Sequence, residues 1–349
     1  MSEMRDILVD QVDRLLADQV DKSALEAAER GETPQALARA VEEQGLYRLR
    51  APEAFGGADG DWGDVGAVLR AAARRQAPLP LAESMIACAL LADAGIDIPD
   101  GPLTVAPVRR EDRIEIADGK VSGAAHRVPF ARSVPHFVVM ATREREPFVA
   151  LVRAADCRIA PESNVAGEPR DTVTFGGVRA VAAKLAGRGA DARLLWNRGA
   201  MARSCQMAGA LEFLLAQSVQ YANERVQFGR PIGKFQAIQQ QLAVLATQVA
   251  AAIAASEEAC EAADRGEAPF ETAVAKIRAG EAANIGPSIA HQVHGAIGFT
   301  YEHSLHFATR RLWSWRAEFG SAGWWSRELG RQVCERGADA LWPFLTARR

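Results

Sequence analysis

An arginine that precedes a tight turn is the feature of this sequence that most directly suggests ligand chemistry. The stretch that begins at Arg225 reads RVQFGRPIGKFQAIQ. It predicts that a long helix ends near Arg225, that glycine and proline form a turn after Phe228, and that a new helix starts near Phe235. The planar guanidinium of an arginine at such a corner can bind a phosphate through two hydrogen bonds. The alternative is an ordinary helix–turn–helix corner whose arginine faces solvent.

Histidines and cysteines are the next residues that could do chemistry. His291 with His294, and His303 with His306, have H-x-x-H spacing. No carboxylate or cysteine set completes either pair, and the H-E-x-x-H pattern of zinc enzymes is absent, so we predict no metal site. The five cysteines are scattered, odd in number and never spaced C-x-x-C. This argues against a disulfide framework and fits a reducing compartment.

The elements that must position these residues run in the order helical, β, helical. We predict a helical N-terminal domain over residues 1–100, a middle β-domain over 101–187 and a C-terminal helical bundle over 188–349. Gly187–Gly189 is the expected linker, and Asp118–Gly119 is the expected hairpin turn. The expected strands are Leu103–Val108, Arg113–Ile116, His136–Met140, Phe148–Val152 and Val173–Phe175.

Apolar residues in the last third repeat at the spacing of helices. One stripe runs from Met201 to Val219 and a second from Phe235 to Ile253. A third helix is expected from about 270 to 294, interrupted by Pro287, and two more near 301–317 and 321–336. The last two carry four tryptophans, which either fill the bundle core or form a surface for a partner.

Composition excludes several functional classes. The chain has 349 residues, 48% hydrophobic and 24% charged, which is ordinary for a globular protein of two or three packed regions. The net charge of −3 gives no sign of nucleic-acid binding. No window approaches the ~18 uninterrupted apolar residues of a membrane span, and the N-terminus alternates charged with apolar residues. We therefore expect a cytoplasmic protein with no membrane partner.

Four motifs, in order along the chain, give this sequence a family resemblance. The stretch after Arg225 closely resembles the acyl-CoA dehydrogenase family. Pro52–Gly57 (PEAFGG), Asp171–Val178 (DTVTFGGV) and His291–Thr300 (HQVHGAIGFT) are similar to further motifs of that family. The resemblance spans residues 52 to about 320. It implies an α+β, mostly α fold with a helical N-terminal domain, a middle β-domain and a C-terminal four-helix bundle.

The resemblance also implies an FAD site shared between two subunits. Arg225 would pair with the flavin pyrophosphate of a neighbouring subunit, and Phe228 would pack near the adenine. Phe235 and Gln236 would line the same pocket. The remaining positions lie in the segment after His291: Gln292 would hydrogen-bond the dinucleotide, Gly295 and Ala296 would let the backbone approach it, and His291 and His294 would line the pocket.

Two departures from the family concern the flavin ring and the catalytic base. The stretch Gly123–Ala131 lacks the family's aromatic-Ile/Val-Ser/Thr-Asn element, and Thr104–Val108 stands where a T-E-P-x-A-G-S-D segment is expected. The chain's own β-domain is therefore expected to cover a flavin ring poorly or not at all. At the usual position of the glutamate base, just before Gly320, stands Phe319.

Glu318 lies one residue early, and a shift of one residue rotates a helical side chain by about 100°. The family's alternative base position falls near Arg198–Ala200, where there is no acid. Glu318 is thus either an unusual base or a salt-bridging surface residue.

These features leave two functional hypotheses. In the favoured one, the chain is the base-lacking partner of a homologous acyl-CoA dehydrogenase subunit, as in heteromeric members that act on steroid side-chain thioesters. In the other, it is a self-sufficient homo-oligomer with Glu318 as base. Both imply FAD, an acyl-CoA substrate, α,β-desaturation, and a dimer of dimers in which the chain is never a stable monomer.

Overall fold

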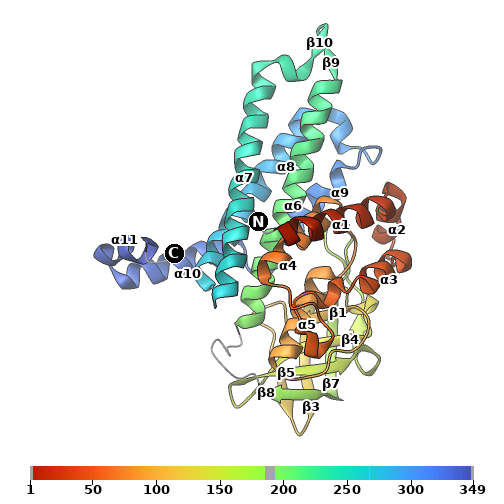
Figure 1. Ribbon diagram of the computed structural model, residues 1–349, viewed down its shortest axis with the longest axis vertical. Helices are drawn as coiled ribbons and strands as arrows, with labels where there is room; N and C mark the ends of the chain where they lie inside the picture. The colour runs from red at the N-terminus through yellow and green to blue at the C-terminus, as the bar shows by residue number, and fades with distance from the viewer. Residues whose placement is uncertain (1–2, 185–192, 267, 347–349) are drawn as a thin grey trace.

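A computed structural model describes residues 3–184, 193–266 and 268–346 of the chain, and Figure 1 shows its ribbon. Helices at both ends of the chain enclose a single large sheet, so the predicted α+β, mostly α fold class is confirmed. The expected linker Gly187–Gly189 lies outside the described residues.

The N-terminal region forms five helices before the first strand. They are α1 (Glu3–Gln19), α2 (Lys22–Glu29), α3 (Gln35–Glu43), α4 (Trp62–Arg74) and α5 (Leu81–Asp93). Asp61 and Asp64 begin α4 with a reciprocal capping box. Helix α5 is apolar almost all round, and it packs against strands of the sheet.

The sheet of the described chain has eight strands in the order β6-β7-β3-β2-β4-β5-β8, and β1 pairs with β4. Asp118–Gly119 forms the predicted hairpin turn between β2 and β3. All five expected strands are present, but β3, β6 and β8 were not expected. The bounds are β1 Leu103–Ala106, β2 Ile114–Ala117, β3 Lys120–Pro129, β4 His136–Arg143, β5 Glu146–Arg153, β6 Arg158–Ala160, β7 Arg170–Arg179 and β8 Val181–Lys184.

Sequence reasoning missed β3 because it does not alternate cleanly. Its pairing with β7 shifts register twice, near Val121 and near Ala125. Buried residues therefore do not recur at every second position along the strand.

Four helices build the C-terminal bundle: α6 (Leu194–Glu224), α7 (Gln236–Arg265), α8 (Pro269–His294) and α9 (Leu305–Trp315). Helix α8 runs from Pro269 to His294 with Pro287 inside it, as the predicted third helix does. The upper parts of α6 and α7 project beyond the rest of the molecule as a helical hairpin (Figure 1). We call this projecting part, with the turn that joins the two helices, the hairpin tip.

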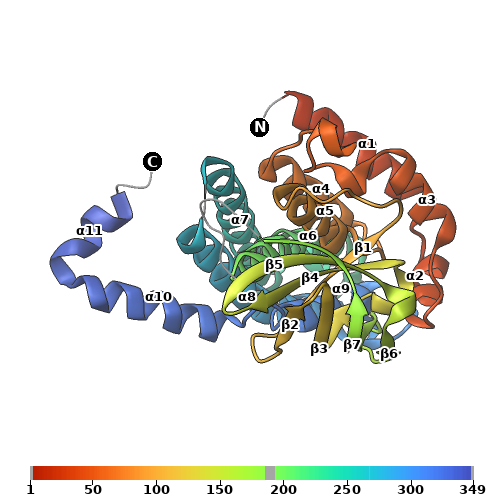
Figure 2. The ribbon, with the colours of Figure 1, turned by 90° about the horizontal axis from the view of Figure 1, so that it is seen from below.

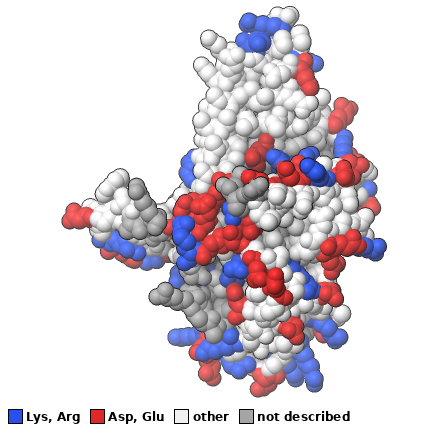
Figure 3. All heavy atoms as spheres, viewed as in Figure 1, with Lys and Arg blue, Asp and Glu red and all other residues white. Residues whose placement is uncertain are grey.

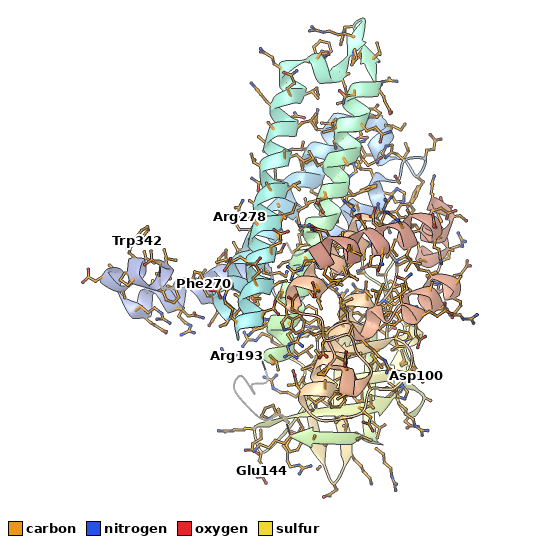
Figure 4. The ribbon with its side chains drawn as sticks, in the orientation of Figure 1. Asp100, Glu144, Arg193, Phe270, Arg278 and Trp342 are labelled. Atoms are coloured by element: carbon orange, nitrogen blue, oxygen red, sulfur yellow. The ribbon has the colours of Figure 1, made fainter. Side chains whose placement is uncertain are left out.

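The chain ends in an arm. Helices α10 (Ala322–Arg336) and α11 (Ala338–Thr346) extend away from the sheet and bundle, as Figure 2 shows from below. Sequence analysis did not foresee α11, which contains Pro343. Trp342 lies on this arm, 72% exposed and far from the body in Figure 4. Of the four earlier tryptophans, Trp315 and Trp325 are buried in the cores.

One described helix, α7, is long and apolar enough by length and composition to cross a membrane, although little of it is buried inside the chain. Its buried residues begin only at Leu245 and lie against α6 and α8. A helix that packs along one face and leaves the other uncovered also suits a protein–protein contact.

Candidate functional site

The hairpin tip carries the arginine that opened the sequence analysis. Arg225 ends α6, and its backbone N–H donates to the Tyr221 carbonyl over 2.8 Å. Two short strands, β9 (Val226–Gln227) and β10 (Arg230–Pro231), form a tight turn at Phe228 and Gly229, both with positive φ. The Ile232 N–H then donates to the Arg225 carbonyl over 2.8 Å and closes the corner. The tight turn predicted from glycine and proline is present.

Side chains at the tip point away from the chain's own core. Phe228 is 92% exposed, and Arg225 and Gln236 are also exposed, whereas Phe235 is half-buried. The Phe228 and Phe235 rings meet edge to face at 6.1 Å. The Arg225 side chain makes no ion pair or hydrogen bond with the described part of the chain. The tip therefore carries an exposed cation and an exposed aromatic ring, two groups that can bind a ligand or a partner.

Arg230 is a tip residue that sequence reasoning missed. Its guanidinium lies 4.2 Å from the centre of the Phe235 ring. Figure 3 shows basic atoms at the very end of the hairpin, with an acidic patch close by and a largely uncharged surface further down. The signal was available, because Arg230 lies in the same motif as Arg225, only five residues on.

The end of α8 lies at the same end of the bundle as the tip. The His294 ring stacks on Tyr221 of α6, with ring centres 4.6 Å apart. Gln292, Gly295 and Ala296 are exposed there. Gly295 has φ +62° with nothing near the position of a Cβ, so the backbone is open to a close ligand. The structure thus places the two sequence-predicted segments on one exposed end.

His291 and His294 serve the core of this end. Both are buried, and burial lowers the pKa of each ring, which favours the neutral form. His291 stacks on Phe299 at 4.4 Å. Among the described residues, no group of three or more His, Cys, Asp or Glu side chains could hold a metal ion.

Glu318, the candidate base, lies elsewhere in the molecule. It follows α9 and receives a 2.7 Å hydrogen bond from Arg170 Nε and another of 2.7 Å from Arg203 Nε. Burial alone would raise its pKa, but the two guanidiniums outweigh burial and lower the pKa to about 2. The expected alternative of a salt-bridging surface residue is right about the salt bridges but wrong about the surface, because Glu318 lies mostly buried between two arginines. A carboxylate held so firmly ionised is a poor proton acceptor.

Glu318 is one member of a longer buried network. Arg203 also pairs with Glu83 of α5. On the other side, Arg170 pairs with Glu168 over 2.9 Å, and Glu168 pairs with Arg311 of α9 over 3.1 Å. We call this series the ion-pair chain: Glu83, Arg203, Glu318, Arg170, Glu168 and Arg311. Its three acids and three arginines join the N-terminal helices, the sheet and the bundle.

Phe319 occupies a strained and enclosed position beside the ion-pair chain. It is buried, with φ +52°, and its ring lies directly against Gly199 of α6. A Cβ on Gly199 would lie 2.4 Å from the Phe319 ring. Trp196 packs edge to face against the same ring at 6.0 Å. An aromatic side chain therefore fills the space between this loop and α6.

Comparison with known proteins settles the family. Residues 187–324 match "Acyl-CoA dehydrogenase, C-terminal domain" and residues 2–97 match "Acyl-CoA dehydrogenase, N-terminal domain". The chain belongs to the acyl-CoA dehydrogenase family. The resemblance inferred from the four motifs is confirmed.

Relatives of full length share this family. The chain is 29% identical to acyl-CoA dehydrogenase IpdE2 of Mycolicibacterium smegmatis over 89% of this chain and 93% of that one. It is also 29% identical to IpdE2 of Mycobacterium tuberculosis, over 97% and 98%.

Solved structures of the family superpose closely. A variant of the Tcur3481–Tcur3483 steroid acyl-CoA dehydrogenase has a TM-score of 0.87 at 25% identity, with 95% of this chain and 98% of that chain covered. The ChsE4–ChsE5 complex of Mycobacterium tuberculosis has a TM-score of 0.86 at 23% identity, with 97% and 99% covered.

Phe319 and Gly199 therefore contact each other. They lie at, or within the stretch of, the two positions where the family resemblance would place a glutamate base. Sequence analysis named both positions but did not foresee their contact, because 120 residues separate them. Neither residue has a group that can accept a proton.

The strand ends where the sequence was expected to depart from the family are held by contacts within the chain. Thr104 is buried, and its hydroxyl donates a 2.6 Å hydrogen bond to the Pro129 carbonyl. Arg170 of the ion-pair chain lies 5.7 Å from the centre of the Phe130 ring. The Thr104 hydrogen bond therefore joins β1 to the end of β3, and Phe130, which follows β3, packs beside Arg170 of the ion-pair chain.

Proposed function

We propose that this chain is the base-lacking subunit of a heteromeric FAD-dependent acyl-CoA dehydrogenase. The assembly would carry out α,β-desaturation of an acyl-CoA thioester. A homologous subunit would provide the glutamate, and this chain would complete that subunit's flavin site. The observation that carries the proposal is the contact of Phe319 with Gly199, which leaves both base positions without an acid.

The hairpin tip fits half of an FAD site. Members of the family bind FAD, and the flavin supplies the acceptor for the hydride that leaves the substrate's β-carbon. The unpaired Arg225 would bind the pyrophosphate, with Phe228, Phe235 and Gln236 beside the adenine. From the end of α8, Gln292 would hydrogen-bond the dinucleotide, and Gly295 and Ala296 would allow its close approach.

The exposed hairpin fits a subunit contact. No residue of α7 before Leu245 is buried, and Val244 is 47% exposed. Figure 3 shows a largely uncharged surface on the hairpin further down from its end. A stable partner would cover such a surface, and obligate interfaces bury about 2,000 Å² or more. We therefore propose that the chain forms at least a dimer and, with its partner, a dimer of dimers.

The relatives support the choice of partner and substrate class. The named similar structures include one complex of two different chains and one steroid acyl-CoA dehydrogenase. We propose a steroid side-chain thioester as the acyl-CoA substrate, a cytoplasmic location, and three domains at 1–100, 101–187 and 188–349. The alternative remains a homo-oligomer with Glu318 as its base, and the ion pairs of Glu318 argue against it.

Co-purification tests the proposal directly. The chain is produced alone and together with a homologous subunit that retains the glutamate, and flavin is measured per protomer. We expect little flavin in the chain alone, and flavin with desaturase activity in the mixture. Stoichiometric flavin and full activity in the chain alone would establish the homo-oligomer. A stable 37.5 kDa monomer that binds no homologous subunit would contradict both hypotheses.

A further inference from the structure

Two buried cysteines that belong to neither the hairpin tip nor the ion-pair chain lie side by side between α6 and α7. Cys205 of α6 and Cys260 of α7 are each 2% exposed, and their sulfur atoms are 3.6 Å apart. A disulfide needs sulfurs about 2.05 Å apart. A movement of roughly 1.5 Å, shared between two side-chain rotations, separates the thiol pair from that bond.

The surroundings leave room for a small oxidant. A cavity of about 120 Å³ is lined by both cysteines and, among others, by Arg5, Arg70 and Ser256. Gly66 of α4 lies above the pair, and a Cβ there would come within 2.7 Å of the Cys260 sulfur. The missing side chain at this glycine keeps space open next to the thiols. A cavity of this size accommodates water-sized molecules when polar groups line it.

We propose that Cys205 and Cys260 form an oxidisable pair that hydrogen peroxide converts to a disulfide between α6 and α7. In the first step, one sulfur attacks peroxide, the O–O bond breaks, and a sulfenic acid and water form. In the second step, the other sulfur attacks the sulfenic sulfur, the S–O bond breaks, and a second water leaves. Two thiols are oxidised by two electrons, and one peroxide is reduced to two waters.

The other cysteines of the chain are placed differently. Cys88 is buried in the N-terminal core, Cys157 is half-buried in the β-domain, and Cys334 is exposed on α10. None of the three has a second sulfur within hydrogen-bonding distance in the described chain. The hydrogen bond between the Cys205 and Cys260 thiols, together with burial, raises the pKa of the Cys260 thiol. Oxidation is therefore expected to be slow at neutral pH and faster at alkaline pH.

The new bond would join two helices whose bridged residues are 55 positions apart. Such a cross-link restricts the unfolded chain and leaves the folded helices where they are. We expect the oxidised protein to melt at a higher temperature, and dithiothreitol to reverse the shift. The inference does not depend on the proposed flavin role.

Mass spectrometry of the whole protein tests the proposal. The reduced, desalted chain, in the assembly in which it is purified, is treated with hydrogen peroxide. We expect a loss of about 2 Da and one cross-linked peptide pair that contains Cys205 and Cys260. Cys334→Ala is the matched control and should lose the same mass, whereas Cys205→Ala and Cys260→Ala should not.

Two results would overturn the proposal. One is a native protein in which Cys334 oxidises while both buried thiols remain free. The other is a disulfide that involves any other cysteine. If the alanine variants do not fold, the peptide map of the wild-type chain decides the question by itself.

Discussion

The hairpin tip and the ion-pair chain differ in whether their arginines form ion pairs within the chain. At the tip, Arg225 stands exposed without a partner in the described chain. In the interior, Arg170 and Arg203 are both 2% exposed, and each forms ion pairs with two carboxylates of the same chain. One region is incomplete until something binds, and the other is complete already. This difference supports the proposal that the chain supplies part of a flavin site to a partner and carries no catalytic base of its own.

The largest expected effect comes from breaking the ion-pair chain at its middle. Arg203→Met leaves Glu83 and Glu318 buried without their shared cation, which should cost about 3–5 kcal/mol of unfolding free energy. Chemical denaturation measures this loss. Arg39→Ala, at an exposed arginine, is the matched control and should change little. A loss below ~1 kcal/mol would show that the buried pairs contribute no more than surface pairs do.

The next prediction concerns how the stability that Glu318 contributes depends on pH. Because Glu318 has a folded-state pKa of about 2, below its ordinary 4.5, it contributes stability above pH 4.5 that is lost as the pH falls toward 2. The shift corresponds to about 3 kcal/mol. Denaturation of wild type and Glu318→Gln should therefore differ most near neutral pH and converge in acid. A difference that stays constant with pH would contradict the assignment.

Removing the exposed arginine should affect cofactor retention without affecting the fold. Arg225→Ala removes a charge-assisted contact worth about 1.5–3 kcal/mol, or roughly ten- to a hundredfold in flavin affinity of the assembly. Its unfolding free energy should stay near wild type, because the side chain is exposed and makes no hydrogen bond or ion pair within the described chain. Arg225→Lys should restore only part of the affinity. Flavin bound as tightly as in wild type would falsify the pyrophosphate role.

The smallest effect is on turnover. In the heteromeric assembly, Glu318→Gln should change the rate per folded complex by less than about twofold, because the glutamate of the homologous subunit does the proton transfer. Flavin content and folding are measured in parallel. A fall of 10²–10⁴-fold, the cost of losing a general base, would instead make Glu318 the base.

Features that depend on residues close together in the sequence could be predicted, whereas contacts between residues far apart in the sequence could not. The turn after Arg225 and the stripes of α6 and α7 depend on neighbours within a few residues, so spacing was enough. The ion-pair chain joins Glu83, Arg203 and Glu318, which are more than a hundred residues apart, and no local signal marks them as partners. Strand β3 was missed because its register shifts disturb the alternation.

Helix α6 connects the ion-pair chain, at Arg203, with the hairpin tip, at Arg225. Arg203 and Arg225 lie 22 positions apart, or about 33 Å along a helix. In the proposed assembly, the length of α6 would set how far the partner's flavin lies from Phe319, and its twist would set which way the hairpin tip faces. One residue inserted between Arg203 and Arg225 would turn the tip by about 100° while leaving each region locally intact. Under this proposal, the assembly depends on the register of α6 as much as on the residues at its ends.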